Sequence, residues 1–237
     1  PVTCALLTLD LDEGVVREAL ACGAQLIVGH HPILFHKTDR VTADTAEGRL
    51  LRLMIQNGIG YYAAHTNLDV AKGGLNDLLA HKLGVLQPQL LQYTQGTYEG
   101  IGRIGTLAQP EPLAALAARV ERTLGCAHLR YAGSDDTSIT RVAVNTGGGT
   151  AVIFDAAARG AQVLITGDFK YPQVRECLDM GLCVIDAGHY ETEIIVCELF
   201  EQLLSAAFGD ALRLVAVTAN TNVLKRTCGA PPQAVRG

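Results

Sequence analysis

Two adjacent histidines stand at the end of an apolar segment that has the character of a β-strand. His30 and His31 follow residues 25–29 and precede Pro32. Successive side chains of a strand point to opposite faces, so two imidazoles at a strand end and in the following turn could address two different points. A pair of metal ions would use such an arrangement, although two polar loop residues would give the same pattern.

Three further segments place imidazole or carboxylate side chains just after apolar runs of strand length. These side chains are His65 and Asp69 after residues 59–64, Asp168 after residues 162–165, and His189 and Glu193 after residues 182–188. In open α/β sheets, ligands bind in the crevice outside the carboxyl ends of the strands. The four segments could therefore converge in space, although they span most of the chain.

The position of Glu193 is informative because of the helix predicted over residues 191–208. Glu193 lies three residues before Val196 and seven before Phe200, two members of the apolar stripe, and so belongs to the inward side. One interpretation is a carboxylate that interacts with the free N–H groups of the first helical turn. The other is a metal ligand four residues from His189, on the same side of a turn.

Two other candidate features also have two interpretations each. Asp69 precedes Gly73 and Gly74 in a polar loop, where a turn or a helix cap would use it as well as a metal would. The glycines Gly147, Gly148 and Gly149 lie between a predicted strand and a predicted helix. Their backbone amides could form an anion nest at the helix start, or the glycines could simply permit a tight turn.

Strand-like and helical patterns alternate along the chain, which predicts an α/β fold with largely parallel sheets. Residues 87–112 interrupt the rhythm with prolines and glycines, and we expect them to connect two lobes, with a short strand near residues 103–107. The expected lobes are residues 1–98 and residues 99–237, with the final strand, over residues 212–217, free to return to the first lobe.

Composition narrows the classes of function. The chain has 237 residues, of which 49% are hydrophobic and 18% charged, and a formal net charge of -5. This charge argues against direct binding to nucleic acid or to an anionic membrane. The seven cysteines form no C-x-x-C pair, and several lie inside apolar patterns, which favours a reducing, cytoplasmic location. Because the chain opens with Pro1 rather than Met, we expect a leading segment to precede it.

Taken together, the motifs resemble those of the NIF-three-like family, whose members are named as type 2 homologues of GTP cyclohydrolase I. The resemblance covers nearly the whole chain and five motifs in order. The matching stretches are GHHPILF at residues 29–35, YAAHTNLD at 62–69, GGLND at 73–77, TGDFKY at 166–171 and DAGHYETE at 186–193.

The resemblance implies two α/β lobes with a dinuclear metal centre between them and a toroidal homohexamer. The family's ligand pattern carries over onto His30, His31, Asp69, His189 and Glu193, and His65 matches a position close to the metals. The chain departs from the family in two ways. It lacks the helical segment with which relatives usually begin, and Pro172 stands where many relatives carry a histidine after Lys170 and Tyr171.

These residues predict a centre of two divalent metal ions. Imidazole and carboxylate donors suit Zn, Fe, Mn, Ni or Co rather than Ca. One hypothesis is a metal-dependent hydrolase of a small anionic or nucleotide substrate, for which the resemblance implies GTP ring opening. Gly147, Gly148 and Gly149, with Lys170 as a countercharge, are then candidates to bind the anion. The other hypothesis is a non-catalytic protein for metal handling or regulation.

Overall fold

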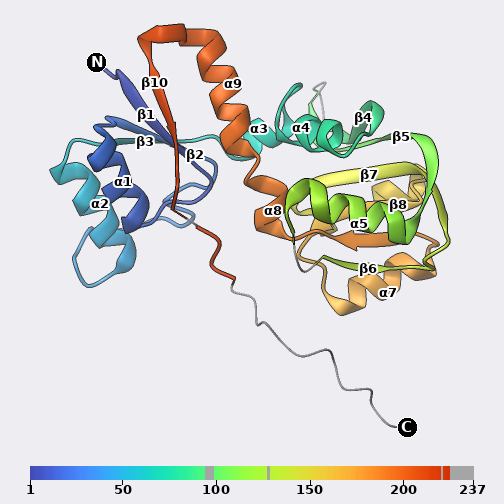
Figure 1. Cartoon of the computed structure of the whole chain (residues 1–237). Helices are drawn as coiled ribbons and strands as arrows, with labels where there is room; N and C mark the ends of the chain where they lie inside the picture. Colours follow the sequence, from blue (N-terminus) through green and yellow to red (C-terminus); the bar gives the residue numbers. More distant parts are fainter. Residues whose placement is uncertain (94–98, 127–128, 220, 225–237) are drawn as a thin grey trace, which may run out of the picture.

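Two β-sheets organise the chain in the computed structural model (Figure 1), which describes residues 1–93, 99–126, 129–219 and 221–224. One sheet is entirely parallel and the other is mixed. The predicted α/β class is confirmed. The expectation of largely parallel strands holds for the first sheet and for the centre of the second.

The parallel sheet has the strand order β10-β1-β2-β3. Its strands are β1 (Cys4–Thr8), β2 (Leu26–Gly29), β3 (Gly60–Ala63) and β10 (Arg213–Ala216). Strand β1 is buried along its whole length, as expected for a parallel strand covered on both faces. The last strand of the chain, β10, pairs with the first, so the carboxyl ends of the four strands lie at one edge.

Helices cover both faces of this sheet. On one face, α1 (Glu13–Cys22) and α2 (Ala46–Gln56) pack against Leu6 and Ile27. On the other face, α9 (Val196–Phe208) contributes Val196, Leu199 and Phe200 to a core with Leu7 and Val28. Helix α1 starts where the side chain of Asp12 accepts a hydrogen bond from Val15 N and ends at Gly23 in the left-handed conformation.

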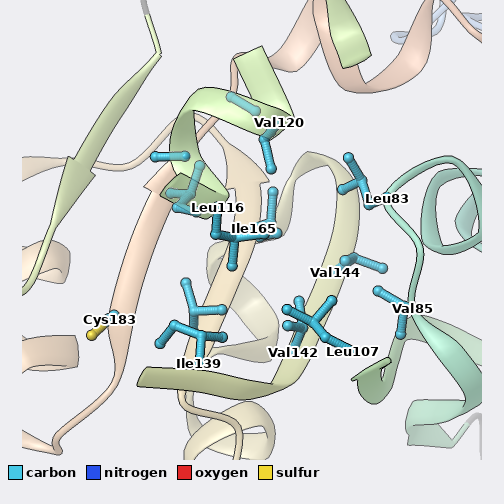
Figure 2. Close-up of a cluster of buried hydrophobic side chains, with 14 of the residues drawn as sticks. Leu83, Val85, Leu107, Leu116, Val120, Ile139, Val142, Val144, Ile165 and Cys183 are labelled. Carbon is cyan, nitrogen blue, oxygen red and sulfur yellow. The ribbon is translucent and has the colours of Figure 1, made fainter. Parts of the chain in front are cut away.

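The mixed sheet has the strand order β4-β5-β7-β8-β9-β6, of which β7, β8 and β9 run parallel. Its strands are β4 (Leu86–Tyr93), β5 (Gly100–Pro112), β6 (Arg130–Ala132), β7 (Ser138–Gly148), β8 (Val163–Gly167) and β9 (Cys183–Asp186). On one face, α5 (Leu113–Leu124) packs Leu116 and Val120 against Ile139, Val142 and Ile165, as Figure 2 shows. The other face is covered by η1 (Gly149–Val152), α6 (Ile153–Ala158) and α7 (Tyr171–Asp179).

Short helices join the two sheets. After β3 the chain forms α3 (Thr66–Val70) and then α4 (Leu75–Lys82), and after β9 it forms α8 (His189–Glu193), while η2 (Gly209–Ala211) leads into β10. Figure 1 shows α3 and α8 between the sheets. The carboxyl ends of β2 and β3 from one sheet and of β9 from the other thus face a common region.

Residues 87–112 contain more regular structure than expected, although residues 94–98 lie outside the described part of the chain. The strand expected near residues 103–107 is found within the longer β5, and β5 pairs with an antiparallel strand, β4, that was not expected. Their prolines are accommodated at irregularities of the pairing: Pro88 falls where the β4–β5 register shifts, and Pro110 falls where the β5–β7 register shifts. Strand β4 is also an edge strand, where a missing N–H donor is tolerated. Proline here marks bulges, not the end of the sheet.

The helix predicted over residues 191–208 is divided. Helix α8 ends at Glu193 and α9 begins at Val196, but Ile194 and Ile195 keep right-handed helical dihedral angles. The division therefore leaves Glu193 close to the inward side that the periodicity predicted, and the residue is buried. Within the described ranges, no helix is long and apolar enough to cross a membrane. The division into lobes at residue 98 stays a prediction. Strand β4, which precedes this residue, pairs with β5, and the final strand β10 pairs with β1.

Candidate metal centre

Three imidazoles and two carboxylates from both halves of the chain meet at the strand ends. Glu193 is central to this cluster, because its Oε2 lies 3.0 Å from both His31 Nε2 and His189 Nε2. The Nε2 of His30 lies 3.6 Å from Asp69 Oδ1 and 3.8 Å from Glu193 Oε1. The side chains predicted from the sequence are therefore brought together, although well over a hundred residues separate the first from the last.

Each of the three central imidazoles is anchored through its Nδ1. His30 Nδ1 lies 2.7 Å from the carbonyl oxygen of Ala64. His31 Nδ1 lies 2.7 Å from Asp10 Oδ1, and His189 Nδ1 lies 2.7 Å from Asp168 Oδ2. An acceptor at Nδ1 fixes the proton there and leaves the Nε2 lone pair facing the cluster, which is how metal-binding histidines are usually oriented.

The interior of the cluster contains polar atoms without hydrogen bonds. His30 Nε2 and Asp69 Oδ1 are buried and have no hydrogen-bond partner within the described protein, and the buried Glu193 Oε2 contacts its two imidazole neighbours without hydrogen-bond geometry. Buried polar groups without partners are costly, and native structures contain few of them. A cation coordinated by these atoms would remove the cost, so the residues present fit a metal ion.

The donor atoms fall into two groups that share His31. One group consists of His30, His31 and His65, and the other of His31, His189 and Glu193; within each, one donor atom per residue lies within 4.8 Å of the others. The ring of His65 is 5.1 Å from that of His30 and 5.5 Å from that of His31, between centroids. These groups could hold a metal ion, and His65 belongs to the cluster.

The ionisation of the cluster is strongly coupled. Contact with Glu193 raises the pKa of His189 to about 9 despite its burial, and Asp168 adds to the effect. Burial lowers the pKa of His31, but Asp10 and Glu193 outweigh it and raise the value to about 9. Burial alone would raise the pKa of Glu193, yet the three imidazoles hold it well below its usual value. The metal-free cluster therefore pairs a carboxylate with protonated imidazoles.

The pKa of Asp69 is raised and that of His65 is lowered, opposite to the shifts of Glu193 and of the other two histidines. Burial raises the pKa of Asp69 to about 6, although His30 opposes this. Burial and the neighbouring His30 lower the pKa of His65, so this imidazole is neutral at neutral pH. A neutral imidazole has a lone pair that can bind either a metal ion or a proton.

The glycine segment approaches the cluster closely. A Cβ atom on Gly147 would lie 2.1 Å from Glu193 Oε1, and one on Gly149 would lie 2.2 Å from Thr166 Oγ1. The N–H of Gly147 already donates to Thr192 Oγ1 at 2.9 Å, so it is not free for an anion. The need for glycine at both positions agrees with the tight-turn interpretation. Anion binding by Gly148 and Gly149 stays a prediction.

A cleft of about 480 Å³ opens beside the donors. Apolar side chains of Phe35, Ile101 and Val152 form part of its wall, and Asn145 and Thr146 contribute polar groups. Among its described lining residues there is no lysine or arginine. Lys170, the predicted countercharge, is exposed and is not part of this lining.

Sequence reasoning missed Asp10 and did not assign a role to Asp168. Asp10 follows β1 just as His30 follows β2, so the same strand-end rule would have found it. Asp168 was noted only for its position, and its left-handed backbone angle, φ 63°, is rare for a residue other than glycine. Such strain is tolerated where the surroundings require it, here to reach His189.

The comparisons with known proteins agree with the geometry. A protein of Clostridium perfringens named "GTP cyclohydrolase 1 type 2 homolog" is 39% identical over 193 residues, which cover 81% of this chain and 74% of that protein. A crystal structure of a Staphylococcus aureus hypothetical protein superposes with a TM-score of 0.89 at 26% identity, covering 95% of this chain and 88% of the other. The fold is also that of a Bacillus cereus protein related to NIF3, with a TM-score of 0.86 at 24% identity over 96% of this chain and 90% of that one.

A family profile, Duf34/NIF3 (NGG1p interacting factor 3), matches residues 1–223, nearly the whole chain. The predicted resemblance is thereby confirmed, and this chain is a member of the Duf34/NIF3 family.

Proposed function

We propose that the cluster binds two divalent metal ions through His30, His31, Asp69, His189 and Glu193, with His65 as an additional ligand or a neighbouring base. The observation that carries the proposal is the set of buried donor atoms without hydrogen bonds, surrounded by imidazoles whose Nδ1 atoms are already anchored. The two overlapping donor groups support two ions rather than one. Nitrogen and carboxylate donors favour Zn, Fe, Mn, Ni or Co.

We further propose that the centre serves a metal-dependent hydrolase of a small substrate, anionic or nucleotide. A pair of bound ions supplies an activated water near neutral pH and polarises the group under attack. The protein's own contribution is the cleft, where Phe35, Ile101 and Val152 form an apolar part of the wall and the neutral His65 lies beside the other donor atoms. The name of the Clostridium relative makes GTP ring opening the first reaction to test.

The alternative is a metal-handling or regulatory protein without turnover. One observation favours it: the described lining of the cleft has no lysine or arginine, so the protein offers a phosphate no cation of its own there. A substrate that reacts at an uncharged ring would also satisfy this observation. Hydrolysis of a phosphate ester would have to rely on the metal ions for charge neutralisation.

The deciding experiment combines metal analysis with a substrate screen. The protein is purified without added metal, loaded, and analysed for bound ions; the proposal expects two per chain, and one or fewer contradicts it. GTP, guanosine and simple phosphomonoesters are then tested with and without a chelator. Turnover that disappears with chelator and returns with a transition metal supports the hydrolase. Full metal occupancy without any turnover across this panel favours metal handling.

We also propose a homo-oligomer, with the family's hexamer as the expected form. An apolar groove of about 500 Å³ lies between β2, β3 and α9 and supports a contact between copies. Its rim exposes Tyr62, Leu203 and Phe208, each about half accessible to solvent, and large exposed apolar patches usually mark interaction sites. A monomeric mass by light scattering at micromolar concentration would refute this.

A further inference from the structure

A buried chain of hydrogen bonds links the two halves of the donor cluster through the end of β7. It begins at Asn76, which is fully buried near the start of α4. The Nδ2 of Asn76 donates to the backbone carbonyl of Asp69 at 3.1 Å. Its Oδ1 accepts the N–H of Thr146 in β7, also at 3.1 Å. One side chain thus ties the helix that carries Asp69 to the mixed sheet.

Thr146 adds a second connection to the same residue. Thr146 also lowers the pKa of the Asp69 carboxyl, against the larger effect of burial. The carbonyl of Asp69 is therefore tied to β7 through the side chain of Asn76. The carboxylate oxygen Oδ1 of Asp69 faces His30 without a hydrogen bond.

The next residue of β7 connects to the other half of the cluster. The N–H of Gly147 donates to Thr192 Oγ1 at 2.9 Å, and Thr192 is fully buried in α8 between His189 and Glu193. The Thr192 hydroxyl in turn lies 2.9 Å from the carbonyl oxygens of Gly188 and His189 and can donate to either. On the opposite side, Thr166 Oγ1 donates to the carbonyl of Gly147 at 2.9 Å.

This arrangement has a geometric consequence. Asp69 comes from the segment that follows the parallel sheet, whereas His189 and Glu193 follow the mixed sheet. Residues 146–147 are adjacent in one strand, so the distance between the two attachment points is fixed by covalent geometry. A Cβ atom on Gly147 would overlap Glu193 Oε1, so the backbone of β7 already lies in close contact with this carboxylate.

We propose that Asn76 and Thr192 are positioning residues that set the separation between Asp69 and the pair His189 and Glu193, with Thr146 and Gly147 as the rigid spacer. The proposal rests on the proposed function, since this separation matters only if these residues hold metal ions. Neither side chain needs to touch an ion. Each acts through the backbone that carries a ligand, as partners outside the ligand set commonly do. The GGLND segment, recognised in the sequence as a family motif, thereby receives a physical role for its asparagine.

The test uses the full chain loaded with Mn²⁺. It compares Asn76→Ala, Thr192→Val and Thr192→Ser with the unchanged protein. The readouts are the number and affinity of bound ions and the magnetic coupling between two Mn²⁺ ions seen by electron paramagnetic resonance. Coupling depends on the separation of the ions, which a loss of stability alone does not alter in molecules that remain folded.

A matched control lies in the same sheet. The side chain of Gln162, just before β8, also bonds to backbone groups of β7: its Oε1 accepts the N–H groups of Thr140 and Arg141, and its Nε2 donates to the carbonyl of Ser138. None of these groups belongs to the donor cluster. Gln162→Ala therefore removes a comparable set of hydrogen bonds from the sheet without affecting the proposed spacer.

The expected result is a roughly 10- to 100-fold weaker affinity for at least one ion in Asn76→Ala and in Thr192→Val, with loss or change of the coupled signal. Thr192→Ser keeps the hydroxyl and should keep both properties. Gln162→Ala should lower the unfolding temperature and leave the signal intact. Because both positions act on one spacer, the double variant should lose less than the sum of the single variants.

Two outcomes would overturn the inference. One is unchanged affinity and coupling in Asn76→Ala and Thr192→Val while the unchanged protein binds two coupled ions. The other is an equal loss in Gln162→Ala, which would mean that the effect is general destabilisation. If Asn76→Ala does not fold, Thr192→Val decides, because it removes one hydroxyl at nearly constant volume. Failure of the unchanged protein to bind two ions refutes the proposed function itself, and this result is distinguishable from both.

Discussion

The two halves of the donor cluster are held in different ways. His30, on the side of the parallel sheet, is fully buried, and its Nδ1 is fixed by a backbone carbonyl. His189, on the side of the mixed sheet, has a side chain that is 40% exposed, and its Nδ1 is fixed by Asp168, whose side chain is 59% exposed. A backbone carbonyl cannot move without moving a strand end, whereas an exposed carboxylate can change rotamer.

This difference indicates a rigid half and a half open to solvent. The rigid half fixes where one ion would bind, and the open half provides the route by which an ion or a substrate could enter. Glu193 belongs to both, because its two oxygens face His30 on one side and His31 and His189 on the other. Variants that alter one half should therefore differ in the size of their effects from variants that alter the other half or both.

The largest effect is expected for Glu193→Gln. The amide keeps the volume but removes the charge that both halves share, so metal affinity should fall by more than the roughly 10- to 100-fold typical of residues outside the ligand set. Far-ultraviolet circular dichroism should be unchanged. Elemental analysis of the loaded protein measures the loss.

Glu198→Gln is the matched control for that variant. Glu198 lies on α9, pairs with Lys82 at 2.6 Å and belongs to neither donor group. It should bind metal like the unchanged protein. If Glu193→Gln retained both ions, Glu193 would not be a metal ligand. Its carboxylate would then serve only the free N–H groups of the first helical turn.

The second prediction compares His30→Ala with His189→Ala in the metal-free protein. The first variant leaves a cavity and a buried carbonyl oxygen at Ala64 without its partner, which costs about 1–3 kcal/mol in the free energy of unfolding. The second removes a partly exposed side chain, and at pH 9, where the contribution of its ion pair with Glu193 is largely lost, it should cost less than about 1 kcal/mol. Urea denaturation in the presence of a chelator gives both values. Equal costs would contradict the distinction between a rigid and an open half.

The positions of the donors along the chain were predictable because they follow a local rule. The donors follow β2, β3 and β9, each of which ends a short apolar run, and the polar residue after the run marks the carboxyl end of the strand. The inward side of Glu193 followed from helical periodicity, which the break at Ile194 and Ile195 disturbs only slightly. Convergence of these ends is a consequence of parallel α/β topology.

The anchors of the donors were not predictable in the same way. The carbonyl of Ala64 that holds His30 is a backbone group, so the residue type at position 64 does not indicate this contact. Asp168 reaches His189 through a left-handed backbone conformation, which a sequence pattern does not specify. Strand β4 and the full length of β5 were not predicted because proline usually interrupts strand pairing, whereas the pairing of β4, β5 and β7 accommodates it at bulges.

The third prediction concerns the carboxylates that orient the imidazoles. Asp10→Asn and Asp168→Asn each remove a charge at Nδ1 while keeping the size of the side chain, and each should weaken metal binding by roughly 10-fold or more. Asp10 is the less exposed of the two, so its variant should have the larger effect. Competition with a chromogenic chelator measures the affinities. The reverse order would mean that the exposed half controls affinity.

The last prediction is a dependence of stability on pH, and its sign depends on whether metal is bound. In the metal-free protein, the pKa of His31 and of His189 is raised to about 9, compared with about 6.5 in an unfolded chain. A raised pKa of a base contributes stability that is complete below pH 6.5 and is lost as the pH rises toward 9. The metal-free protein should therefore become less stable between pH 6.5 and 8.5.

The other shifted groups of the cluster do not reverse this trend. Asp69, with its pKa raised to about 6, loses its contribution mainly below this window, and the lowered pKa of Glu193 gives a contribution that is already complete. With metal present the sign should change, because ions replace the protons at Nε2 and bind more tightly as those protons leave. Urea midpoints at pH 6.5, 7.5 and 8.5 test both branches, and Asp10→Asn should flatten the metal-free branch. A metal-free protein that gains stability over this range would contradict the pairing of Glu193 with protonated His31 and His189.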